Sequence, residues 1–117
     1  MDISEILTTT QSTDTYQVDL VNIKEIDMMH TSTITNYYRE QSEALASKTL
    51  ILDLAYVNYL DSSGMGCLIS LQIKDYGPKK LILANIKDTI WKIFVISGIA
   101  EKVIKAENVD DAISMIQ

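Results

Sequence analysis

The pattern of hydrophobic positions begins with a period of two. Apolar and polar residues alternate from Tyr16 to Ile23, which predicts a strand. Residues Ile3–Leu7 form a weaker strand candidate. The polar stretch Thr8–Thr15 between them is typical of a loop, so the two strands are predicted to form an antiparallel hairpin.

A helical period then replaces the alternation. Apolar residues recur three and four positions apart over Thr33–Ala46 and again over Met65–Tyr76, which predicts two helices. The second helix is expected to end at Gly77–Pro78, because this pair is a strong stop signal. The polar residues that can cap the start of the first helix are Thr31, Ser32 and Thr33.

Short apolar runs between the helical segments predict buried strands. Two of them, Leu50–Leu54 and Lys80–Ala84, show little alternation, as expected for central strands covered on both faces. Val103–Lys105 is a shorter candidate. Further helices are predicted over Asp88–Ser97, closed by Gly98, and from Asn108 onwards.

Strands that alternate with helices indicate the α/β fold class. The opening hairpin adds an antiparallel pair, so the sheet is expected to be mixed, with about four to five strands and about four helices. The chain has 117 residues, of which 47% are hydrophobic and 22% are charged, an ordinary balance for a globular protein. We therefore expect one domain over residues 1–117.

The charge balance restricts the kinds of partner. Sixteen acidic residues against ten basic ones give a formal net charge of −6. Nucleic acids and anionic bilayers are bound chiefly by clustered positive charge, so neither is an expected partner. A partner with a basic contact surface is favoured instead.

Targeting segments and metal chemistry are not indicated. The apolar stretches are far shorter than the roughly 20 residues of a membrane helix, and the acidic N-terminus lacks the features of a secretory signal. The single cysteine, Cys67, and the single histidine, His30, cannot supply a disulfide or a nitrogen–sulfur metal site. We expect a cytoplasmic protein without a metal or cofactor.

The most informative segment is the junction between a short apolar run and the second predicted helix. Asp61, Ser62 and Ser63 lie there, followed by Gly64 and Gly66. Unpaired N–H groups at a helix start favour a phosphate, and glycines allow the active site of another protein to approach the backbone. The same residues also suit a plain helix cap and a tight turn. Spacing alone leaves both interpretations open.

The sequence around this junction resembles the signature of STAS domains, specifically that of bacterial anti-sigma factor antagonists. The resemblance is carried by the aliphatic run Leu50–Leu54 and by the block Asp61-Ser62-Ser63-Gly64-Met65-Gly66. Other segments match in order over roughly residues 16 to 117, although Lys24 stands where the family usually has glycine. The weaker matching segments are Lys24–Asp27, Leu81–Asn85, Ile93–Ile99 and Asn108–Ile113.

The resemblance implies a monomeric, non-enzymatic switch protein. Ser62 matches the residue that an anti-sigma factor serine kinase phosphorylates, with Ser63 as the alternative acceptor. The unphosphorylated form would bind the anti-sigma factor and release a sigma factor, and a PP2C-type phosphatase would reverse the phosphorylation. The expected partner-contact residues are Asp27, Asp61, Ser62, Ser63, Gly64, Met65 and Gly66. For Asp27, a simple helix cap is an equally good explanation.

Three alternatives remain at this point. A STAS subunit of a stressosome or of a lipid-transport assembly would keep the fold and use the loop for docking. A phospho-Asp receiver would use Asp53, but its magnesium-binding acidic pair would lie some 40 residues earlier, whereas Glu25 and Asp27 lie only 28 and 26 residues upstream. A serine hydrolase would require a general base, and only His30 is a candidate histidine.

Overall fold

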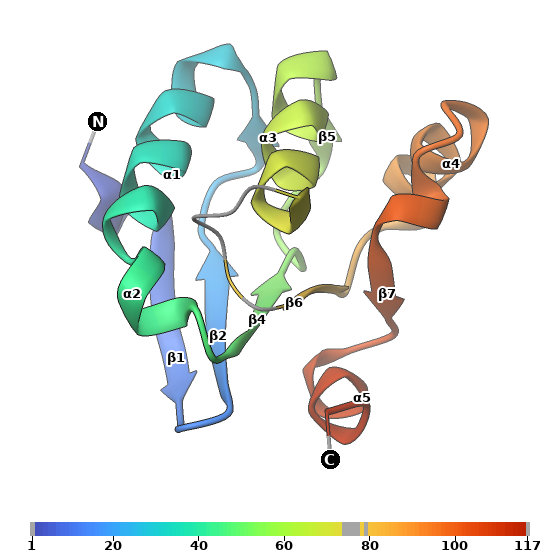
Figure 1. Ribbon diagram of the computed structural model, residues 1–117. Coiled ribbons are helices and arrows are strands. Elements are labelled where there is room, and N and C mark those ends of the chain that lie inside the picture. The colour runs from blue at the N-terminus through green and yellow to red at the C-terminus, as the bar shows by residue number, and fades with distance from the viewer. Residues whose placement is uncertain (1, 74–77, 79, 117) are drawn as a thin grey trace.

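Five strands form one mixed sheet in the computed structural model, which describes residues 2–73, 78 and 80–116 (Figure 1). The spatial order is β1-β2-β4-β6-β7. Strands β1 and β2 pair antiparallel, and every other neighbouring pair is parallel. The strands are β1 (Leu7–Ser12), β2 (Tyr16–Val21), β4 (Thr49–Asp53), β6 (Lys80–Ala84) and β7 (Ile104–Ala106).

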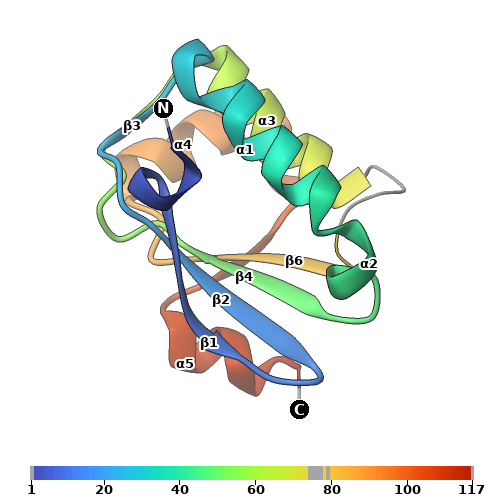
Figure 2. The ribbon, with the colours of Figure 1, turned by 90° about the vertical axis from the view of Figure 1, so that its left-hand side faces the viewer.

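Helices cover the two faces of the sheet unequally. Figure 2 shows α1, α3 and α4 on one side of the strands and α5 on the other. The larger core contains side chains from α1, α3 and α4, while the smaller core holds Ala112 of α5 against Val18, Ile51 and Ile82. The helices are α1 (Met28–Glu40), α2 (Ser42–Leu45), α3 (Ser62–Ile73), α4 (Asp88–Ile96) and α5 (Val109–Ser114), with 3-10 turns at Ile3–Glu5 and Ala100–Lys102.

A second, two-stranded sheet aligns the starts of two helices. Its strands, β3 (Glu25–Ile26) and β5 (Tyr59–Leu60), are parallel, and Ile26 pairs with Leu60. Asp27 and Asp61 follow these strands directly and precede α1 and α3. The pairing therefore places the two aspartates side by side, each at the beginning of a helix.

The predicted α/β class, the mixed sheet and the opening hairpin are confirmed. The central strands are buried on both faces, since Leu50 and Leu52 face the larger core and Ile51 faces the smaller one. Gly98 closes α4 with a φ of 77°, a left-handed conformation that favours glycine at a helix end.

The two predictions for the N-terminal segment are wrong. Ile3–Glu5 forms a 3-10 turn rather than a strand, and most of the expected loop Thr8–Thr15 is the edge strand β1. The β-branched threonines have a high preference for strands. An edge strand can expose polar side chains on both faces, so its polar composition does not exclude pairing.

The predicted start of the first helix is also wrong. Helix α1 begins at Met28 rather than Thr33, because Asp27 accepts a hydrogen bond from the Met29 N–H and caps it. His30 consequently lies inside the helix and not before it. The end expected for α3 near Tyr76 and Gly77 lies outside the described residues.

A buried carboxylate links the hairpin to α1. Asp19 of β2 has no exposed surface, although the alternation had grouped it with polar positions. It accepts hydrogen bonds from the hydroxyls of Thr9 (2.6 Å) and Tyr38 (2.5 Å) and from the Gln17 amide (3.0 Å). Burial of this charge is possible because three donors surround it.

Candidate functional site

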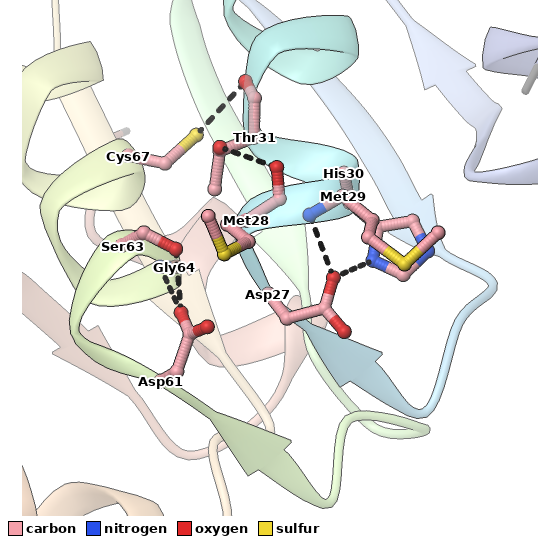
Figure 3. A network of polar contacts seen from close by, with 9 residues as sticks. All are labelled: Asp27, Met28, Met29, His30, Thr31, Asp61, Ser63, Gly64 and Cys67. Carbon is pink, nitrogen blue, oxygen red and sulfur yellow. Dashed lines mark hydrogen bonds and ion pairs between the residues drawn. The ribbon is translucent and has the colours of Figure 1, made fainter.

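Asp61 caps α3 and organises the segment around Ser62. Its Oδ1 accepts hydrogen bonds from the Ser63 hydroxyl at 2.7 Å and from the Gly64 N–H at 2.8 Å (Figure 3). Its backbone oxygen accepts the Met65 N–H at 3.0 Å. These donors stabilise the ionised form, so the pKa of the Asp61 carboxyl is lowered, first by Ser63 and then by Gly64. The carboxylate at this site is therefore charged at neutral pH.

The two adjacent serines have different surroundings. Ser62 is the first residue of α3 and is exposed, and within the described chain its hydroxyl has no hydrogen-bond partner. The Ser63 side chain is half-buried and its hydroxyl donates to Asp61. The hydroxyl of Ser62 is thus accessible to another protein, whereas that of Ser63 already contributes to the helix cap.

Gly64 has a packing role that the sequence did not indicate. It is buried, and a Cβ atom at this position would lie 2.2 Å from the backbone oxygen of Ile26. This close approach of α3 to β3 is possible only for glycine. The expectation that Gly64 leaves the backbone open to a partner is wrong, because the neighbouring strand occupies that space.

Gly66 fits the expectation of an open backbone. It is exposed, and no atom lies within 4 Å of the position that its Cβ would take. Met65, between the two glycines, is half-buried and packs against the larger core. Gly66 also borders a surface groove of about 440 Å³ between α1 and α3. The other groove residues are Thr31, Ser32, Thr35, Asn36, Arg39, Ser63, Cys67 and Ser70.

Asp27 caps α1 as Asp61 caps α3. Its Oδ1 accepts the Met29 N–H at 3.0 Å and lies 2.9 Å from Nδ1 of His30 (Figure 3). The helix-cap interpretation of Asp27 is confirmed. The side chain of His30 is only 13% exposed, so this residue is largely shielded from solvent beside the cap.

Exposed apolar side chains flank this pair of caps. Met28 and Met29, in the first turn of α1, are 75% and 76% exposed, and Tyr59 of β5 is 51% exposed. Exposed apolar side chains that gather on one surface often mark contact sites. Sequence reasoning missed the two methionines because they precede the periodic part of α1.

The remaining candidate chemistry is accounted for by packing. Cys67 is buried, and burial raises the pKa of its thiol. Asp53 accepts hydrogen bonds from the Ala55 N–H at 3.1 Å and from the Asn85 amide at 3.0 Å. Over residues 2–73, 78 and 80–116 we find no cluster of three or more His, Cys, Asp or Glu side chains suited to a metal ion. Nor is any helix in this part of the chain long and apolar enough to span a membrane.

Comparison with known proteins identifies related sequences and folds. A family model of the STAS domain matches residues 8–112. The structure of unphosphorylated SpoIIAA, an anti-sigma factor antagonist, is similar with a TM-score of 0.68 at 19% identity, over 94% of this chain and 96% of that one. Phosphorylated SpoIIAA, a Bacillus cell fate determinant, gives a TM-score of 0.66 at 22% identity, with coverages of 95% and 99%.

A third structure is similar at lower sequence identity. It is an anti-sigma-factor antagonist (STAS) domain protein from Planctomyces limnophilus, with a TM-score of 0.78 at 11% identity, over 94% of this chain and 97% of that chain. At these identities the three structures show a shared fold. The family match is to a STAS domain and not to a receiver, so the receiver alternative based on Asp53 is set aside.

Proposed function

Because the chain belongs to the STAS-domain family, we propose that it is an anti-sigma factor antagonist whose partner binding is controlled by phosphorylation of Ser62. In this proposal the unphosphorylated protein binds an anti-sigma factor that is also a serine kinase, and a sigma factor is released. Phosphorylation ends the binding, and a PP2C-type phosphatase restores it.

The observation that carries the proposal is the contrast between the two serines. A kinase requires a hydroxyl that it can reach and reorient in its own active site. Ser62 offers such a hydroxyl, at the exposed start of α3, while the Ser63 hydroxyl is held by Asp61 at 2.7 Å. This contrast favours Ser62 over Ser63 as the phosphate acceptor.

The surroundings of Ser62 also support a large effect of phosphorylation on binding. A phosphoserine carries about −1.5 to −2 charges at pH 7. Two unit charges about 6 Å apart repel by roughly 3 kcal/mol at an effective dielectric constant of about 20. Asp61, which lies beside Ser62, is charged, so the phosphate would add to an existing negative charge on this surface.

Helix α3 offers the phosphate few donors in return. The N–H groups of Gly64 and Met65 already donate to Asp61, at 2.8 and 3.0 Å. A phosphate on Ser62 would therefore extend towards solvent or towards a bound partner. A cost of about 1.4 kcal/mol in the complex is enough to weaken binding tenfold.

The site assignment is tested by incubating the protein with the serine kinase and ATP and locating the phosphate by mass spectrometry. We expect the wild type and Ser63→Ala to be phosphorylated on residue 62, and Ser62→Ala to take up no phosphate. Full phosphorylation of Ser62→Ala would show that the acceptor is elsewhere.

The charge effect is tested by calorimetric titration of the kinase with Ser62→Asp. Binding at least about tenfold weaker than that of the wild type is expected. Ser114→Asp is the matched control, because Ser114 is exposed on α5, on the opposite face of the sheet (Figure 2). Equal affinities of Ser62→Asp and the wild type would contradict the electrostatic part of the proposal.

A further inference from the structure

Lys87 occupies a position where a cation is electrostatically unfavourable. It is the N-cap residue of α4, next to the positive end of the helix dipole, and its side chain does not cap the helix. Its backbone oxygen instead accepts the N–H groups of Ile90 and Trp91 at 3.0 and 2.9 Å. The charged side chain is therefore explained by contacts outside α4.

Those contacts are with the segment that joins β4 to β5. Nζ of Lys87 donates hydrogen bonds to the backbone oxygens of Ala55 (2.9 Å) and Val57 (3.3 Å). It also donates to the side-chain oxygen of Asn58 at 2.5 Å. One ammonium group thus uses its three donors on three oxygens of one short segment, and this segment leads directly to Ser62.

Asn58 is held from two sides. Lys87 binds its side chain, and its backbone N–H donates to the oxygen of Lys24 at 2.7 Å. The N–H of Tyr59 donates to the same oxygen at 3.2 Å. The backbone of Tyr59 is consequently fixed, although its side chain is 51% exposed.

Tyr59 lies close enough to Ser62 to touch any protein that covers it. Three residues of extended chain span at most about 11 Å. A standard interface buries about 800 Å² on each partner, which corresponds to a disc of about 16 Å radius. Tyrosine is enriched in such interfaces because it offers a large, rigid contact area.

From these contacts we propose that Lys87 is a positioning residue: it fixes residues 55–58 so that the Tyr59 side chain forms part of the surface that the partner contacts beside Ser62. The partner is the anti-sigma factor kinase, so this inference rests on the proposed function. It adds a residue from α4 that acts on binding without contacting the partner, and an aromatic contact before the phosphorylation site.

The positioning step is tested in the free protein by hydrogen exchange. Lys87→Met removes the three donors while keeping an unbranched side chain only one heavy atom shorter, and Lys92→Met is the matched control at an exposed lysine of α4. We expect the amides of Asn58 and Tyr59 to exchange at least about threefold faster in Lys87→Met and at the wild-type rate in Lys92→Met. Unchanged exchange in Lys87→Met would overturn the positioning role.

The contact step is tested by a double-mutant cycle on kinase binding. We expect Lys87→Met to weaken binding about fivefold and Tyr59→Ala about tenfold, and the double variant to be no weaker than Tyr59→Ala. Such non-additivity is the signature of one residue that acts through the other. Lys87→Arg should restore part of the affinity, because it keeps the charge and the donors. Additive effects, or a neutral Tyr59→Ala, would overturn the inference.

The outcome also separates this inference from the proposed function. If the wild-type protein does not bind the kinase, the proposed function fails, and Tyr59 loses its role as a contact with it. If the wild type binds and is phosphorylated on Ser62 but the cycle is additive, only the role of Lys87 and Tyr59 fails. Thermal unfolding of each variant identifies any loss of affinity that comes from unfolding.

Discussion

The hydroxyl of Tyr38 donates a 2.5 Å hydrogen bond to the carboxylate of Asp19, and neither side chain is exposed to solvent. Tyr38 belongs to α1 and Asp19 to β2, so this contact joins the helix to the sheet in the protein interior. Helix α1 also carries the Asp27 cap at its other end. The position of the candidate site relative to the sheet thus depends on a buried polar contact as well as on hydrophobic packing.

We expect Tyr38→Phe to lower the free energy of unfolding by about 1.5–3 kcal/mol, the range for a hydrogen bond to a charged group. The substitution leaves a buried carboxylate with one donor fewer. Urea unfolding at neutral pH measures the loss. Tyr59→Phe is the control, because Tyr59 is exposed and should change stability by less than about 0.5 kcal/mol. A loss of the same small size for Tyr38→Phe would show that the contact contributes little.

Alkaline pH should destabilise the wild type through the same residue. Burial, and then the nearby charge of Asp19, raise the pKa of Tyr38 well above its ordinary value of 10.0. The unfolded chain ionises its tyrosines near pH 10, while the folded protein keeps Tyr38 neutral. The stability that this provides is present below pH 10 and is lost as the pH rises towards the folded-state pKa.

Denaturant unfolding at several alkaline pH values tests this expectation. The stability of the wild type should fall more steeply above pH 10 than that of Tyr38→Phe, which has no phenol at this position. Some decline should remain in the variant, because burial also raises the pKa of Tyr37. Parallel curves for the two proteins would contradict the assignment to Tyr38.

The two glycines of α3 should respond in opposite directions to alanine. A Cβ at Gly64 would lie 2.2 Å from the Ile26 backbone oxygen, so Gly64→Ala should cost at least about 2 kcal/mol. Gly66 has open space around it, and Gly66→Ala should stabilise the helix by about 0.5–1 kcal/mol. Thermal unfolding of the two variants measures both changes in stability. Equal effects would mean that α3 has room for a methyl group at position 64 beside β3.

Asp61→Asn separates the charge of the α3 cap from its hydrogen-bonding capacity. Asparagine is also a good cap residue, so the helix should persist. The pKa of Asp61 is lowered from its ordinary value of 3.8, so the carboxylate stabilises the fold above pH 3.8. This contribution is lost as the pH falls through the folded-state pKa. The difference in melting temperature between the wild type and Asp61→Asn should therefore shrink in acid. A difference that is independent of pH would contradict this assignment.

The features predicted correctly are those set by local sequence. The strands near Leu50–Leu54 and Lys80–Ala84 are apolar runs with no alternative environment, and Asp61 followed by Ser62 is a clear helix start. The start of α1 was missed because Met28 and Met29 precede the residues that follow the apolar period of this helix. The strand β1 was missed because an edge strand can be almost entirely polar.

The features that escaped prediction depend on residues far apart in the chain. The requirement for glycine at position 64 comes from the backbone of Ile26, and the burial of Asp19 depends on Tyr38. The difference between Ser62 and Ser63 follows from how the first turn of α3 directs each side chain, which spacing alone does not reveal. Lys87 gave no signal at all, because its contacts with Ala55, Val57 and Asn58 form only once α4 lies beside the segment before β5.

The position of α5 offers a practical way to test the proposed partner exchange. This helix lies on the opposite side of the sheet from α3, which Ser62 begins, and Ser114 on α5 is exposed (Figure 2). The chain has a single cysteine, Cys67, which is buried with a raised pKa and therefore reacts poorly with thiol reagents. Ser114→Cys would thus accept a fluorescent dye or a surface tether selectively. Molecules attached through this site would all present Ser62 outwards, so that association and release could be followed in real time on an oriented layer.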